Sequence, residues 1–310
     1  MPLLSRKRLI LAKTEAVYGT DSVPTGAEAI LVRNIEITPL QADVVSRDLI
    51  RPYLGNYEQL LAQTRVEITF EVELAGSGAA GTAPAYGSLL KACGLAETVV
   101  ATTSVTYAPV SSAFSSVSIY LNNDGVRHRI TGARGSFSTN CQVGQIPTIS
   151  FTFMGIYNEP TDVALPTPTY ANQATPLIFK EGNTSAFSLL SYSGCLQSFE
   201  FDLANQMIYR ELVGCTKQVN ITDRQPSGTV VIEAPTVTQK NYWADATGTA
   251  TGNLTFLHGT TAGNRVTITS PQTDIGSPTY TDQDGIQMLS LPFVATPTTA
   301  GNDELSVAFT

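Results

Sequence analysis

Glu67, Glu71 and Glu73, on alternate positions of one segment, are the residues of this sequence best suited to acid–base chemistry. Two carboxyl groups at a suitable separation suffice for glycoside hydrolysis, and residues two apart on a strand face are roughly 6 to 7 Å apart. However, no neighbour in the sequence would hold one of them protonated, and no cluster of aromatic residues accompanies them to hold a sugar. We therefore expect a solvated strand face.

The other residues with catalytic or metal-binding potential are isolated. The two histidines, His128 and His258, lack a partner at metal-ligand spacing. Asp282-Gln283-Asp284-Gly285 resembles part of a calcium loop, but the remaining ligands and the terminal Glu of an EF-hand are missing. The Gly/Ala-rich stretch 75–83 lacks the Gly-Lys-Ser/Thr ending of a phosphate-binding loop. We therefore predict no enzymatic activity, no metal and no cofactor.

The glutamates lie on the clearest strand of the sequence. Between residues 66 and 74 the even positions are apolar, and three of the four odd positions are acidic. This period of two predicts one buried face and one acidic face in contact with water.

The segments that flank this strand occur twice, in the same order. Ile35-Glu36-Ile37-Thr38 returns as Phe199-Glu200-Phe201-Asp202, and residues 149–155 return as 289–295. Between each pair of markers we expect a short helix (84–93; 238–246) and a further strand pair (117–131; 254–269). A duplicated β unit indicates an element that packs against copies of itself, which favours a repeated assembly over a lone active site.

Composition predicts a mainly β fold. Only 14% of the residues are charged, and the apolar residues lean toward Val, Ile, Phe and Tyr, which fit a pleated surface. With 310 residues there is room for two cores. We predict two tandem β-sandwich units, each with one short α-helix. The proposed division is an N-terminal arm (1–28) lying across a neighbouring molecule, a first unit (29–160), a proline-marked linker (161–190) and a second unit (191–310).

The charge is uneven along the chain. Residues 1–160 hold 12 Lys/Arg against 13 Asp/Glu, whereas residues 161–310 hold 6 against 13. An acidic surface repels phosphate, so sequence-specific binding of nucleic acid is not expected. The four cysteines lack metal-binding or disulfide-scaffold spacing, and no segment approaches the roughly 20 apolar residues of a membrane span. We expect reduced thiols in a cytosol.

The N-terminal sequence carries a family resemblance. Residues 9–21 (Leu-Ile-Leu-Ala-Lys-Thr-Glu-Ala-Val-Tyr-Gly-Thr-Asp), followed by 23–30 (Val-Pro-Thr-Gly-Ala-Glu-Ala-Ile), resemble the opening of major tail tube proteins of long-tailed, non-contractile bacteriophages. The strand-loop-strand at 32–74, the following helix and the doubled β unit also fit that family.

The resemblance implies a structural protein of the virion tail, assembled in the cytoplasm of the bacterial host. Its units would place strands side by side in a closed barrel around an acidic lumen that conducts viral DNA without binding it specifically. A chain with two units would form a homotrimeric, pseudo-sixfold ring, and rings would stack into a tube. The partners implied are further copies of the chain, together with tail terminator, distal tail and tape measure proteins.

Three groups of residues follow from this reading. The acids expected to face the lumen are Glu36, Glu67, Glu71, Glu73, Glu200 and Asp202. The loop expected to join stacked rings contributes Asp43, Arg47, Asp48, Arg51, Tyr53, Tyr57 and Glu58. The N-terminal arm is expected to make contacts through Arg6, Lys7, Arg8 and Tyr18.

Two other classes of protein remain open. A virion decoration or receptor-binding protein, built from similar sandwiches, would present exposed aromatic clusters at loop tips. A carbohydrate-active enzyme or lectin-like module would show turnover or saturable sugar binding.

Overall fold

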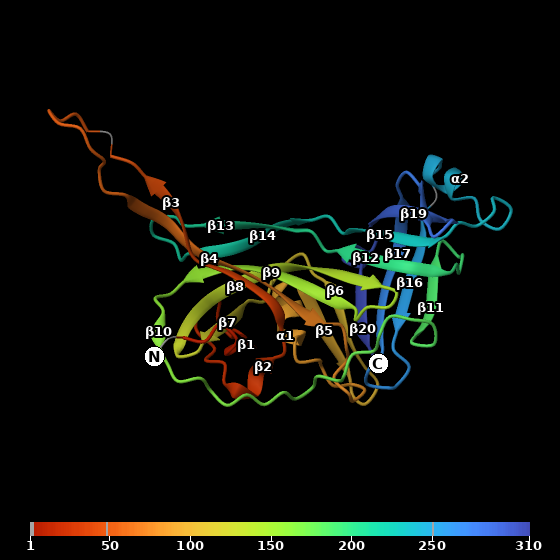
Figure 1. Ribbon diagram of the computed structural model, residues 1–310, viewed down its shortest axis with the longest axis horizontal. Coiled ribbons are helices and arrows are strands. Elements are labelled where there is room, and N and C mark those ends of the chain that lie inside the picture. The colour runs from red at the N-terminus through yellow and green to blue at the C-terminus, as the bar shows by residue number, and fades with distance from the viewer. Residues whose placement is uncertain (1–2, 48, 250) are drawn as a thin grey trace.

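The computed structural model describes residues 3–47, 49–249 and 251–310, and the prediction of a mainly β fold is confirmed (Figure 1). The elements of the first half are β1 (Arg8–Thr14), the 3-10 helix η1 (Gly26–Glu28), β2 (Ala29–Ile30), β3 (Arg33–Val45), β4 (Leu60–Glu73), α1 (Gly87–Ala92), β5 (Leu95–Val100), β6 (Ser104–Pro109), β7 (Val117–Asn123), β8 (Val126–Gln142) and β9 (Thr148–Tyr157).

The second half repeats the main elements of this order, without a counterpart of β5 and β6 and with β20 added at its end. Its elements are β10 (Thr161–Asp162), β11 (Thr184–Leu189), β12 (Leu196–Asp202), β13 (Asn205–Arg210), β14 (Gln218–Arg224), β15 (Ser227–Glu233), α2 (Tyr242–Thr247), β16 (Gly252–His258), β17 (Val266–Ile275), β18 (Thr279–Gln283), β19 (Ile286–Ala295) and β20 (Ser306–Phe309). Both predicted helices and both predicted strand pairs are present.

The two halves share strand register as well as order. In the first, Thr38 on β3 lies opposite Glu67 on β4, and Glu67 lies opposite Met154 on β9. In the second, Asp202 on β12 lies opposite Ser227 on β15, which lies opposite Val294 on β19. The repeat seen in the sequence is therefore a repeat of hydrogen-bonded positions.

One sheet runs through both halves. Its strands follow one another as β3-β4-β9-β8-β12-β15-β19-β18, and the join between the halves is the antiparallel pair β8–β12. In the part of the chain that the structure describes, β3 pairs with β4 alone and β18 pairs with β19 alone. This run of eight strands therefore ends in two open edges, while β8 and β19 also pair with β7 and β17.

The predicted alternation along β4 is confirmed. From Val66 to Val72 its even residues are at most 3% exposed, and the odd glutamates are partly exposed. Phe70 packs against the rings of Phe151 and Phe153, with centroids 6.0 and 6.2 Å away.

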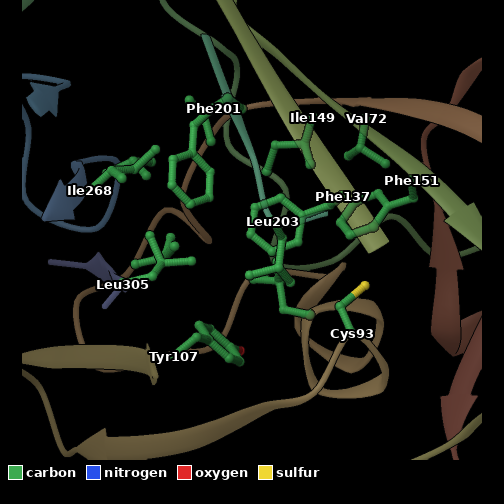
Figure 2. Packing of buried hydrophobic residues seen from close by; sticks show 14 of the residues in the cluster. Val72, Cys93, Tyr107, Phe137, Ile149, Phe151, Phe201, Leu203, Ile268 and Leu305 are labelled. Atoms are coloured by element: carbon green, nitrogen blue, oxygen red, sulfur yellow. The ribbon is translucent and has the colours of Figure 1, made fainter. Parts of the chain in front are cut away.

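The core continues across the join between the halves. Phe137 and Phe151 of the first half face Phe201 and Leu203 of the second, and Ile268 and Leu305 approach from the far side (Figure 2). The Phe137 and Phe201 rings lie 6.4 Å apart. Because these side chains are buried together, the halves are held by packing as well as by β8–β12.

The N-terminal arm and the linker differ from expectation, because each contributes a strand to the body of its own chain. β1 pairs with β7 along its whole length, and its residues Leu9–Ala12 are buried. β11 pairs with β16 in the corresponding place of the second half. The expectation that the arm lies across a neighbouring molecule is therefore wrong for residues 8–14. A run of four apolar residues is enough for a short strand buried on both faces.

Candidate functional site

One face of the long sheet is lined by small polar and acidic side chains. Cross-strand partners share a face, and the register sets Glu71, Ser150, Ser138, Asp202 and Ser227 in one row across five strands. The neighbouring rows are Glu36-Thr69-Thr152-Ser136 and Glu73-Thr148-Asn140-Glu200-Thr229. The opposite face carries the apolar core.

The structure places all six sequence-predicted acids on this polar face. Glu36, Glu200 and Asp202 are exposed. Glu67, Glu71 and Glu73 are half-buried between their neighbours on the sheet. The alternation along each strand was sufficient to find them, whereas the strand order that brings the two groups onto one face was not visible in the sequence.

Two of the half-buried glutamates are paired with arginines. The Arg33 Nε lies 2.8 Å from the Glu71 Oε2, and the Arg65 Nε lies 3.9 Å from the Glu67 Oε1. Arg65 also lies 3.6 Å from Asp43. The acidic character of the face therefore rests mainly on the exposed Glu36, Glu200 and Asp202, together with the half-buried Glu73.

A long hairpin, formed by the outer ends of β3 and β4, projects from the body (Figure 1). At its tip the Arg51 guanidinium lies over the rings of Tyr53 and Tyr57, 4.8 and 4.1 Å from their centroids. The Tyr57 hydroxyl donates a hydrogen bond of 2.7 Å to the Leu49 carbonyl. Cation–π contacts of this kind stabilise the folded conformation of the tip.

The remaining predicted residues of the hairpin are solvent-facing. Arg47 and Glu58 form an ion pair of 3.4 Å, and Asp43 is exposed. Asp48 lies outside the described residues. Sequence reasoning missed the apolar residues of the tip: Leu49 is 54%, Ile50 104% and Leu54 102% exposed. Their signal was an apolar set inside a loop of otherwise polar composition.

The four predicted contacts of the N-terminal arm fall into two groups. Arg6 and Arg8 are exposed and, with Arg33, border a pocket of about 300 Å³. Lys7 pairs with Asp124 of its own chain at 3.6 Å. The Tyr18 side chain instead makes its hydrogen bonds within its own chain.

Tyr18 ties the two halves together. Its hydroxyl donates to the Gly132 carbonyl at 3.0 Å and accepts from the Val219 backbone N–H of β14 at 2.6 Å. Arg134 lies 4.7 Å from its ring centroid. Burial is the main cause that raises the pKa of Tyr18 above its usual value of 10.

Tyr18→Phe is expected to lower the free energy of unfolding by about 2 kcal/mol, because two buried backbone groups lose their partner. The raised pKa of Tyr18 makes its contribution complete below pH 10, and the contribution is lost as the pH rises through the folded-state pKa. Urea titrations of wild type and variant should therefore differ at pH 7 and converge at higher pH. Tyr53→Phe, at a side chain 65% exposed, is the control. Equal stability of wild type and Tyr18→Phe at pH 7 would contradict this account.

His128 is half-buried, and His258 is buried and hydrogen-bonded. His258 is buried, with its Nε2 3.1 Å from the Leu177 carbonyl and its Nδ1 3.1 Å from the Thr184 hydroxyl. Burial lowers the pKa of both His258 and His128.

Across residues 3–47, 49–249 and 251–310, no group of three or more His, Cys, Asp or Glu side chains is arranged to hold a metal ion. Among the described residues, no helix reaches the length and hydropathy that crossing a membrane requires.

Comparison with known proteins identifies a family. Residues 5–295 match a family model described as phage tail tube protein. No curated protein sequence matches the chain significantly.

Proposed function

Since the chain belongs to the phage tail tube protein family, and is a structural protein of the phage tail, we propose that three copies close into a pseudo-sixfold ring and that rings stack into a hollow tube. The observation that carries this proposal is the single sheet of both halves, which has two open edges and one polar, acidic face. Open edges invite further pairing, and closing the sheet on itself removes them.

In this proposal the polar face lines the lumen. Glu36, Glu200 and Asp202 supply exposed negative charge there, and Ser and Thr side chains fill the space between them. Carboxylates repel the phosphates of passing DNA, so the contacts that release counterions do not form. The tube conducts DNA because its wall does not hold it.

The projecting hairpin joins stacked rings. Its tip carries Ile50 and Leu54, both fully exposed in the isolated chain, and apolar side chains of this kind mark a surface that another molecule covers. The basic residues Arg6 and Arg8 lie on the surface and remain candidate contacts between molecules. Tail terminator, distal tail and tape measure proteins would meet the ends and the bore of the tube.

The proposed domains follow the repeat. The chain has two β-sandwich units in this proposal. β1 belongs to the first unit and β11 to the second, since these strands pair with the corresponding strands β7 and β16. The linker is then confined to the stretch around Pro166 and Pro168.

Negative-stain microscopy of the purified protein tests the proposal. Rings or tubes with a central hole are expected, and deletion of residues 43–62 should leave rings without full-length tubes. Isolated particles without a hole, at every protein concentration and salt tried, would contradict the proposal.

The alternative, a decoration or receptor-binding protein, is favoured by one feature. Tyr53 is 65% exposed at the tip of the hairpin, as expected of a loop that reads a surface. This alternative predicts particles that bind a virion or a cell surface and never form hollow tubes.

A further inference from the structure

The chain already contains one example of a contact between units. β8 of the first unit pairs with β12 of the second, with Ser138 opposite Asp202 and Asn140 opposite Glu200. Each of these strands has a counterpart at the far end of the sheet. β18 corresponds to β8, because Thr279 lies opposite Ser290 as Ser138 lies opposite Ser150.

The counterpart of β12 is β3. Thr38 lies opposite Glu67 on β4, just as Asp202 lies opposite Ser227 on β15. Both counterparts are open: every residue of β18 is exposed, and in the described chain β3 has β4 as its single strand partner. Each end of the sheet therefore carries a free edge strand that corresponds to one of the two strands of the β8–β12 pair.

On the basis of the proposed tube function, we propose that β18 of one copy pairs antiparallel with β3 of the next copy. The register inside the chain then sets the register between copies: Thr279 lies opposite Thr38 of the next copy, and Thr281 lies opposite Glu36 of the next copy. The contact joins different surfaces of the two copies, so it repeats from copy to copy and closes when the rotation completes a ring.

The hairpins give a second, independent observation. The β13–β14 hairpin lies back across β8 and β9 of the first unit (Figure 1). There the Asn205 backbone N–H donates to the Ser136 Oγ at 3.1 Å, and the Asn205 Nδ2 donates to the Gly135 carbonyl at 2.9 Å. The hairpin covers Gly135, which is buried.

The same surface on the second unit is uncovered. By the same register rule, the counterpart of Gly135-Ser136 is Ile275-Gly276, since Ile275 lies opposite Phe293 as Gly135 lies opposite Phe153. Gly276 and the following Ser277 are exposed. Gly276 borders an open hollow of about 670 Å³, together with Asp274 and Val294, and Val294 is 46% exposed.

The base of the β3–β4 hairpin fits this hollow. Gln41 is the counterpart of Asn205, since each lies three residues after the matched residues Thr38 and Asp202. The hairpin base therefore lies across the second unit of the neighbour whose β18 its β3 joins, with Gln41 against Ile275 and Gly276 of that neighbour. One hydrogen bond of the internal contact is lost, because Leu203 N–H donates to Phe137 O and its counterpart Pro39 has no N–H.

Charge complementarity supports the same pairing. Inside the chain, the Val143 backbone N–H of the β8–β9 turn donates to the Gln197 carbonyl at 3.1 Å. The counterparts are Asp284, in the acidic β18–β19 turn with Asp282, and Arg33. Arg33 borders the pocket that also holds Arg6 and Arg8. The acidic turn of one copy therefore meets Arg6, Arg8 and Arg33 of the next, of which Arg33 already pairs with Glu71. Opposite potentials of this kind steer and orient association.

Cysteine pairs test the register. In a background with the two exposed cysteines replaced (Cys195→Ser, Cys215→Ser), Glu36→Cys with Thr281→Cys is expected to give covalent dimers and closed trimers on oxidation or with a short bis-maleimide. Asn140→Cys with Glu200→Cys is the matched control, because this pair has the same register inside one chain and should crosslink without a change of mass. Ile37→Cys with Thr281→Cys, which moves one thiol to the core face, should not crosslink.

The outcomes separate the interface from the function. Hollow rings or tubes of the Glu36→Cys, Thr281→Cys protein without crosslinks between copies, while the internal control crosslinks, would overturn the register and leave the proposed function standing. Failure of the background protein to form any hollow assembly would remove the proposed function and this interface together. A second variant, Asp284→Lys, is expected to lower the yield of rings by about tenfold or more, and Asp162→Lys, an exposed acid away from the edge, should not. An equal yield of rings from both lysine variants would overturn the charge contact.

Discussion

Replacing Ile50 and Leu54 by aspartate is expected to leave rings intact and to abolish tubes. Both side chains are fully exposed in the isolated chain, so the change removes no contact from the folded subunit. Burying two such side chains at a stacked ring is worth about 4 kcal/mol for each hairpin, and a buried aspartate adds a desolvation penalty. Because every ring uses several hairpins, even a partial loss at each should be enough to separate the rings.

Tube length measured by negative-stain microscopy, together with sedimentation, checks this prediction. Val237→Asp is the matched control: Val237 is 59% exposed, in the loop before α2 and away from the hairpin. The control should form tubes of normal length. Full-length tubes from the Ile50→Asp, Leu54→Asp variant would show that the tip does not join rings.

The strands and helices that depend on the local sequence pattern could be predicted from the sequence. The period of two along residues 66–74 gave the buried and polar faces of β4, and the repeated markers at 35–38 and 199–202 gave matching strands. The helices were found because each lies at the same place in the repeat. Because these features depend on the spacing of residues along the chain, a single sequence is enough to predict them.

Features that depend on long-range pairing were not visible. The apolar run 9–12 is too short to reveal that it pairs with β7, more than 100 residues away. The join between β8 and β12 places Asn140 beside Glu200, and neither residue carries a signal for the other. The spacing of the six acids in the sequence does not predict which strands lie between them in the sheet. The order of strands in a sheet is set by the packing of the whole chain, which a period in the sequence does not encode.

The internal repeat changes what the hairpin can do. If the base of the β3–β4 hairpin lies across the neighbour in the same ring, as β13–β14 lies across the first unit of its own chain, only the part beyond Val45 is free to reach the next ring. Ring closure and ring stacking then use different parts of one hairpin. Variants at Gln41 and at Ile50 should accordingly affect different steps of assembly.

Replacing Glu36 and Glu200 by lysine is expected to give tubes that assemble but release DNA slowly. Both side chains are exposed on the polar face, and the structure records no ion pair for either in the described chain. Glu67 and Glu71 are less suitable for substitution because lysine there would also break their pairs with Arg65 and Arg33. In a ring of three copies, six lysines would meet the phosphates of the passing duplex.

The size of the defect follows from counterion release. About six phosphate contacts strengthen DNA binding enough that affinity falls by roughly a thousandfold between 50 and 200 mM salt. The delay in ejection should therefore be large at low salt and should ease as salt is raised, which phages carrying the variant tube can show in a time course of DNA release. The control is Glu159→Lys with Glu181→Lys, which makes the same change of net charge at two exposed acids outside the sheet. If the lumen variant ejected DNA at the wild-type rate at every salt concentration, the acidic face would not line the bore, because six cations around a confined duplex cannot leave its passage unchanged.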